Sequence, residues 1–418
     1  MTARHQDIRK RLLVVLFAGN AFTSTMIVAA ATVTSLAGEY LSGSARFAGV
    51  PATVGVLGTA VAASVFSQLS YKWGRRRTFV LGAVVAGGGA FIAVVSLWTG
   101  SFVLLVVGLF VMGPGRAINQ LARFAAGDMH ADDRRVSAIS LIVWAATIGS
   151  VLGPRLIARA GAMAEALGIQ AFAGPFMMAG VGYAAAAIYY STMLRPDPME
   201  LAVVESDGPI DVERRPIREV VRIPAIRLAL AALMASQFVM VFVMVISPVH
   251  MRANGHGLDA IGWVMMAHTL GMFAVAPITG AAIRRWGTRP VIVAATGIFL
   301  VAGIVAMTAT TADMATLVVA LFLIGLGWNL GFVAGSTVIQ EELELRDRVS
   351  IQGLGDTLTA LAGAVGAFTT GFVIVWWQYR GVAVVGLIVS LVPLAAVLAN
   401  RASSDAATLA DVAPPRVR

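Results

Sequence analysis

Hydrophobic residues fall in long runs that short polar stretches separate. Most runs are about 20 residues or longer, and an α-helix of that length crosses a hydrocarbon core of about 30 Å. Hydrophobic residues make up 58% of the chain and charged residues 13%, whereas a soluble domain carries about 25% charged residues. The pattern predicts an all-α membrane protein and excludes a soluble domain.

The runs predict twelve membrane spans, six on each side of a polar stretch at residues 195–222. That stretch holds four prolines and many charges, which favours a solvated linker. We therefore expect two six-helix bundles, at 1–194 and 223–400, and a polar, disordered tail at 401–418. The predicted spans are about Leu12–Leu36, Phe47–Ser70, Thr78–Trp98, Phe102–Ala126, Val136–Ile157 and Ala171–Leu194, then Ala225–Val249, Leu258–Ile283, Pro290–Thr310, Ala315–Gln340, Val349–Val375 and Val382–Asn400.

The two halves share sequence features at one offset. Trp-Gly beside arginines occurs at Gly74 and again at Gly287, 213 residues later. Arg135-Val136-Ser137 recurs as Arg348-Val349-Ser350 at the same offset, and Leu109-Phe110-x-x-Gly-x-Gly recurs 212 residues later. A long internal repeat in a hydrophobic chain is typical of a transporter built from two related halves.

Basic residues beside the spans predict the orientation. If the N-terminus is cytoplasmic, 24 Lys and Arg residues lie on the cytoplasmic side and five on the other. The asymmetry places both termini in the cytoplasm. It also explains the net charge of +9 without a nucleic-acid partner.

Twelve spans, a repeat and a basic loop after the second span of each half together resemble the major facilitator superfamily. The family loop reads Gly-x-Leu-x-Asp-Arg-x-Gly-Arg-Arg, and the corresponding residues here begin at Ser67, with Tyr71 at the position of the family's aspartate. The second copy has Arg284 at that position. The resemblance implies twelve helices in two pseudo-symmetric six-helix bundles, with loop residues that gate the cytoplasmic side. These gating residues are Lys72, Gly74, Arg75, Arg76, Arg284, Arg285 and Gly287.

The fifth span contains a second family-like segment. Gly149, Gly153 and Pro154 resemble the Gly-x-x-x-Gly-Pro segment of the family's antiporters, although Arg155 follows where small residues are usual. Two glycines four residues apart let another helix approach closely, and the proline loosens the helix. The resemblance implies an exporter. Helix packing with no bearing on direction is the alternative.

Polar residues inside the predicted spans are few, and each is a candidate for function because intramembrane charges are costly. Arg116, Asn119, Gln120 and Arg123 form one stripe on the fourth span. The stripe is suited to an anionic group or a counter-ion. For Arg123, the alternatives are snorkelling to the cytoplasm and pairing with Asp128.

Asp356 and His268 are the candidates for proton coupling. Asp356 lies about two turns into the eleventh span. We expect it to be the protonation site or the counter-ion to a cytoplasmic arginine, replacing the acid absent at Tyr71, and a static gate-closing ion pair is the alternative. His268 ranks second, because a neutral histidine bonded to a backbone carbonyl is the commoner arrangement.

By the family resemblance, the first, seventh and tenth spans line the cavity together with the fourth. Their polar and aromatic residues are therefore further substrate candidates, although the same residues suit simple helix packing. They are Asn20 and Ser24, Gln237, and Trp328 and Asn329.

The sequence holds no phosphate-binding loop, no metal cluster and no catalytic signature, and we expect no enzyme activity and no cofactor. We predict a monomeric secondary transporter in the bacterial inner membrane that exports small amphipathic compounds by alternating access, energised by a proton gradient. The first alternative is uptake or exchange of a small anionic metabolite. The second is a non-transporting membrane sensor or assembly protein.

Overall fold

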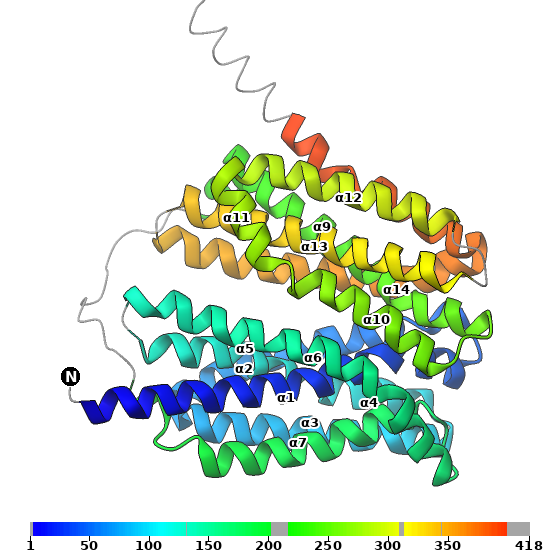
Figure 1. Cartoon of the computed structure of the whole chain (residues 1–418), viewed down its shortest axis with the longest axis horizontal. Coiled ribbons are helices and arrows are strands. Elements are labelled where there is room, and N and C mark those ends of the chain that lie inside the picture. The colour runs from blue at the N-terminus through cyan, green and yellow to red at the C-terminus, as the bar shows by residue number, and fades with distance from the viewer. Residues whose placement is uncertain (1–2, 131, 202–215, 309–312, 344, 399–418) are drawn as a thin grey trace, which may run out of the picture.

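The computed structural model describes residues 3–130, 132–201, 216–308, 313–343 and 345–398. Every regular element in these ranges is helical (Figure 1). The predicted tail at 401–418 lies outside them. The first half comprises α1 (Ala3–Ser42), η1 (Ala45–Phe47), α2 (Val50–Trp73), α3 (Arg75–Thr99), α4 (Phe102–Val111), α5 (Gly113–Asp128), α6 (Asp132–Ala166) and α7 (Ala173–Met193). After η2 (Pro198–Leu201) and α8 (Ile217–Val220), the second half comprises α9 (Pro224–Ala253), α10 (Leu258–Phe273), α11 (Ala276–Trp286), α12 (Thr288–Thr308), α13 (Met314–Glu342) and α14 (Leu345–Ser390).

These helices account for the twelve predicted spans. Within the described ranges, ten helical stretches are long and apolar enough to cross a membrane. The stretch at 354–398 doubles back at Gln378, whose φ of 55° and ψ of −167° break the helix, and it therefore supplies two spans. The remaining span is α7, whose tyrosines, glycines and proline lower its mean hydropathy. The predicted fourth and eighth spans are each broken in two, before Pro114 and before Pro277.

Each half forms its own bundle. In the first, α1 packs against α6 and α7, and α3 against α7; in the second, α9 packs against α13 and α14, and α12 against α13. The repeated loops have the same geometry. Gly74 has φ 84° and ψ 165°, and Gly287 has φ 83° and ψ 170°. Because side-chain-bearing residues avoid this region, glycine is required where each helix turns sharply into the next.

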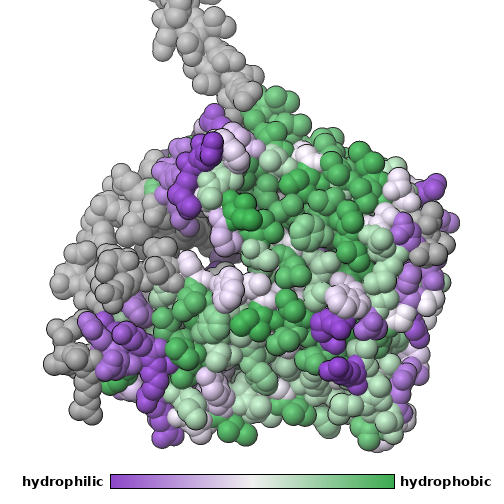
Figure 2. All heavy atoms as spheres, in the orientation of Figure 1, coloured by the Kyte–Doolittle hydropathy of each residue, from purple (hydrophilic) through white to green (hydrophobic). Residues whose placement is uncertain are grey.

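Hydrophobic side chains cover the middle of the visible face, while hydrophilic ones gather at its two ends (Figure 2). We call the end that holds the start of α1 and the two glycine loops the basic end, at the left of Figure 1, and the opposite end the far end. This distribution matches a protein whose apolar belt faces lipid.

The two halves meet closely at the far end. A Cβ on Gly49 would overlap the Ala367 carbonyl oxygen, and one on Gly262 would overlap that of Pro154. Thr53 Oγ1 donates to the Ala364 carbonyl oxygen at 3.3 Å. The helix crossings α2–α14 and α6–α10 therefore close this end.

Arginine–aromatic contacts also join the halves at the far end. A guanidinium over a ring face is attracted by the ring's negative electron cloud. Three arginines on the predicted extracellular side make such contacts across the boundary. They are Arg46 over Phe372 and Trp376, Arg155 over Trp263, and Arg252 over Phe172. We call this set the far-end latch.

Candidate functional site

The polar stripe predicted on the fourth span is the open face of α5. The opposite face of α5 is buried against α1, α2, α3 and α6 of the first half. Arg116 and Gln120 are exposed, and Asn119 and Arg123 are partly exposed. Arg116 is accessible to solvent although protein atoms surround it deep in the bundle. The stripe therefore faces an internal space between the halves, and not lipid.

Arg123 and Asp356 face each other from opposite halves. Their charges interact, but within the described residues no ion pair of 4.0 Å or less joins them. Asp356 is exposed, and the Arg123 guanidinium packs over the ring of Phe124 at 4.8 Å. The halves are thus separated at the level of these residues, toward the basic end.

The Arg116 guanidinium has no hydrogen bond or ion pair within the part of the chain that the structure describes. Its electrostatic neighbour is the buried phenol of Tyr183 on α7. A cation that is held in protein without an acidic partner is available to an anionic or electron-rich ligand.

An aromatic cluster in the second half joins α9, α10 and α13. Trp328 stacks on Phe332 with ring centroids 4.7 Å apart and meets Phe273 edge-on at 6.0 Å. The Trp328 Nε1–H donates to Gln237 Oε1 at 2.8 Å, which links α13 to α9. All four side chains are partly exposed. The sequence predicted Trp328 and Gln237 as cavity residues but gave no signal for Phe273 and Phe332, because aromatic residues are common throughout hydrophobic spans.

Three predicted cavity residues instead form helix–helix contacts in this conformation. Asn20 is 2% exposed and donates from Nδ2 to the Ile142 carbonyl oxygen at 2.8 Å. Ser24, 4% exposed, accepts a hydrogen bond from Asn119 Nδ2 at 3.0 Å. Asn329, 1% exposed, donates to the Met272 carbonyl oxygen and accepts from Thr279. Polar groups in a span need partners, and for these three residues the neighbouring helices supply them. Their role in the cavity stays a prediction.

His268 is fully buried on α10, and its Nδ1 bonds the Leu321 carbonyl oxygen of α13 at 2.9 Å. Since a carbonyl oxygen only accepts, Nδ1 carries a proton. Nε2 is buried, and no described residue forms a hydrogen bond with it. His268 thus has the commoner arrangement, a buried histidine bonded to a backbone carbonyl.

The residues of the antiporter-like segment lie at a junction of three helices. Cβ atoms on Gly149 and Gly153 would meet Ser24, Thr25 and Ala29 of α1 at 3.0 Å or less. Pro154 presents its carbonyl oxygen to Gly262 of α10 in the second half. The two glycines thus bring α6 close to its own bundle, while the proline faces the partner bundle.

Asp197 supplies an acid to the basic loop of the first half. Its carboxylate accepts hydrogen bonds from the backbone N–H groups of Arg75 and Arg76, at 3.0 and 2.9 Å. It therefore caps the first turn of α3. Asp197 follows the sixth span and lies directly against Gly74, so it supplies an acid to a loop that has Tyr71 in place of the family's aspartate. That Asp356 replaces the absent acid stays a prediction.

Asp128 also binds this loop. Its carboxylate accepts from the Arg75 guanidinium at 2.7 Å, and the side chain of Arg75 is 5% exposed. The alternative that Asp128 pairs with Arg123 is therefore wrong. In the second loop, Arg284, Arg285 and Arg289 are exposed, and Arg285 packs over the ring of Trp286 at 5.8 Å.

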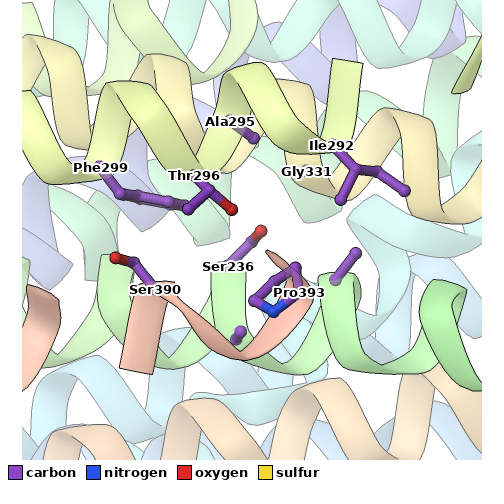
Figure 3. Close-up of a pocket in the computed structure, with 10 residues that line it drawn as sticks. Ser236, Ile292, Ala295, Thr296, Phe299, Gly331, Ser390 and Pro393 are labelled. Carbon is purple, nitrogen blue, oxygen red and sulfur yellow. The ribbon is translucent and has the colours of Figure 1, made fainter. Parts of the chain in front are cut away.

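Among the described residues, no group of three or more His, Asp or Glu side chains is placed to hold a metal ion. A packing gap among α9, α12, α13 and α14 of the second half has essentially no room for a water molecule. Its walls carry Ser236, Thr296 and Ser390 among apolar side chains (Figure 3).

The sequence pattern of the Major Facilitator Superfamily matches residues 13–260 and again residues 228–414, and so covers both halves. The chain belongs to the Major Facilitator Superfamily. This superfamily chain is 32% identical over 402 residues to YdeG, an uncharacterized MFS-type transporter of Bacillus subtilis (strain 168), covering 95% of this chain and 94% of YdeG. It is 27% identical over 363 residues to the riboflavin transporter RfnT of Brucella anthropi, covering 87% of this chain and 88% of RfnT.

Solved structures share the fold of this superfamily chain. The nucleoside transporter NupG superposes with a TM-score of 0.70 at 13% identity, over 92% of this chain and 99% of NupG. At that identity the likeness concerns the fold alone. The prediction of a major facilitator fold with two six-helix bundles is confirmed. The chain is a multi-pass membrane protein and a secondary transporter.

Proposed function

We propose that this protein exports a small amphipathic compound in exchange for protons by alternating access. The observation that carries the proposal is the composition of the inter-bundle face. The Arg116 guanidinium, which has no partner among the described residues, and the amide of Gln120 lie on one half, and the Trp328 aromatic cluster lies on the other. A compound with a planar apolar part and a polar, electron-rich part complements both surfaces.

Asp356 is the proposed proton carrier. Its carboxyl is exposed to the space between the halves and lies within the field of Arg123. When the basic end closes, the two residues are brought together, and the arginine then favours the ionised carboxylate. Proton release would thereby be coupled to closure of the basic end.

The basic residues support a cytoplasmic location for the basic end, as the orientation rule predicts. With the far end closed, the conformation is then open to the cytoplasm. The direction of transport rests on the resemblance of Gly149, Gly153 and Pro154 to the antiporter segment. Export requires the cargo to bind this inward-open form.

Transport by purified protein in liposomes tests the proposal. The first probe pair is riboflavin, which is the named substrate of the relative RfnT, and its phosphate ester, which adds an anionic group to the same planar ring. An imposed pH gradient should drive accumulation of a probe in vesicles that expose the basic end outward. Accumulation only in the opposite orientation would indicate uptake.

Exchange of an anionic metabolite is the second candidate, and Arg116 favours it because this cation has no acidic partner in the described residues. In that case an anion on one side should exchange for an anion on the other without a pH gradient. Exchange should then survive Asp356→Asn and be lost in Arg116→Gln. Proton-driven export should show loss of gradient-driven accumulation in Asp356→Asn.

A further inference from the structure

A groove of about 430 Å³ lies between the basic-end parts of α3 and α7. These helices pack side by side along the edge of the first bundle that faces away from the second half (Figure 1). In a membrane, this edge faces lipid. The groove is separate from the inter-bundle face and from the residues proposed to bind the cargo.

Three arginines line the part of the groove nearest the basic end, beside Trp73. They are Arg76, Arg77 and Arg195. The described residues place no acidic side chain within ion-pair distance of them. Asp197 accepts a hydrogen bond from the backbone N–H of Arg76 and not from the Arg76 guanidinium. Arg195 Nε donates to the Ser191 carbonyl oxygen. Among the described residues, this part of the groove therefore carries three positive charges that no acidic side chain pairs with.

The part of the groove further from the basic end is aliphatic. Val80, Leu81 and Val84 line it one helical turn beyond the arginines, and Val84 is 56% exposed. The exposed stripe continues along α3 through Phe91 and Trp98 at seven-residue steps. Cations beside an apolar wall complement a phospholipid at the membrane surface, because the lipid carries its anionic headgroup beside its acyl chains. Trp73, 50% exposed, lies at the level where tryptophan favours the interface.

We propose that this groove binds one anionic phospholipid. Its phosphate group lies among Arg76, Arg77 and Arg195, and the first part of an acyl chain lies along Val80 and Val84. Guanidinium groups suit phosphate because they offer paired N–H donors in a rigid plane. A free phosphate shares the headgroup chemistry but makes no use of the aliphatic wall.

Native mass spectrometry of the purified full chain tests the site, with dioleoyl-phosphatidylglycerol and dioleoyl-phosphatidylcholine as probes. We expect one phosphatidylglycerol to be retained in preference to phosphatidylcholine. The double variant Arg76→Gln/Arg77→Gln should lower that retention about tenfold or more, as expected for the removal of two interfacial cations. The matched control is Arg284→Gln/Arg285→Gln, which removes the same charge from the repeated loop and should leave retention within about twofold of wild type.

A third variant distinguishes lipid from phosphate. Val84→Trp fills the aliphatic wall and keeps every charge, and it should also lower phosphatidylglycerol retention. The proposal is overturned if phosphatidylcholine is retained equally, or if the two double variants lose lipid equally. It is also overturned if glycerol 3-phosphate displaces the lipid while Val84→Trp has no effect, since the groove would then be an anion site only.

Discussion

The Arg155 guanidinium on α6 lies 4.0 Å from the centroid of the Trp263 ring on α10. The two residues belong to different halves, and the Asp259 carboxylate adds an ion pair to Arg155 at 3.7 Å. Because the residues lie in different halves, we expect the contact to break when the far end opens. It therefore stabilises one of the two states between which an alternating-access transporter moves.

Arg155→Ala should shift the population toward forms with an open far end. A cation–π contact contributes about 0.5–2 kcal/mol depending on its exposure, which corresponds to a population change of up to about thirtyfold. Spin-label distances between exposed far-end positions of the two halves, Leu167 and Arg380, would report the shift. The chain has no cysteine, so labels can be placed in the native sequence. Arg159→Ala, one turn along α6, is the control, and an equal shift in it would discount the ring contact.

Gly49→Ala should prevent closure of the far end more strongly. The added methyl would overlap the Ala367 carbonyl oxygen, and backbone cannot move aside as a flexible side chain can. The same label pair should give mainly the longer distance, and transport should stop. Gly88→Ala is the control, because a Cβ there meets nothing within 4 Å. A wild-type distance in Gly49→Ala would contradict the closed crossing of α2 and α14.

Asp356→Asn should abolish pH-driven accumulation while solute exchange without a gradient persists, because the amide cannot carry the proton. Vesicle transport under both conditions separates the two effects. Glu342→Gln, which removes an exposed acid at the end of α13, should behave as wild type. Normal pH-driven accumulation in Asp356→Asn would move the coupling elsewhere, with His268 the next residue to test.

Arg116→Gln should weaken binding of a probe that carries an anionic group by about tenfold to a hundredfold, as expected when a hydrogen bond to a charged group is lost. Calorimetric titration of the purified protein measures this. Arg116→Lys keeps the charge and should retain part of the affinity. If Arg116→Gln weakens the binding of riboflavin and its phosphate ester equally, Arg116 contributes packing and not charge recognition.

Asp197→Ala should destabilise the first bundle by about 0.5–2 kcal/mol, the usual cost of losing a helix cap. The carboxylate serves three backbone N–H groups, because Met199 N–H donates to it as well at 3.0 Å. Thermal unfolding in detergent measures the loss. Asp197→Asn keeps an acceptor oxygen and should lose less, and equal losses in the two variants would point to charge and not capping.

The sequence alone determined the features that depend on local length and composition. A run of hydrophobic residues must become a helix in lipid because every backbone polar group needs an internal partner. Twelve spans follow from this, and the recurrence of Trp-Gly after 213 residues indicated two repeated halves. The polar stripe on the fourth span also follows, since residues three and four apart share a helix face.

The tertiary structure decided which of those residues meet. Helix rotation within each bundle places Asn20 and Asn329 in helix contacts but leaves Arg116 and Trp328 accessible. Asp197 caps a helix whose first residue lies 122 positions earlier in the chain. The closed far end depends on crossings such as Gly49 with Ala367, where the fit of two surfaces decides the state. Hydropathy fixes that a span crosses the membrane, but only packing fixes which face it turns toward its neighbours.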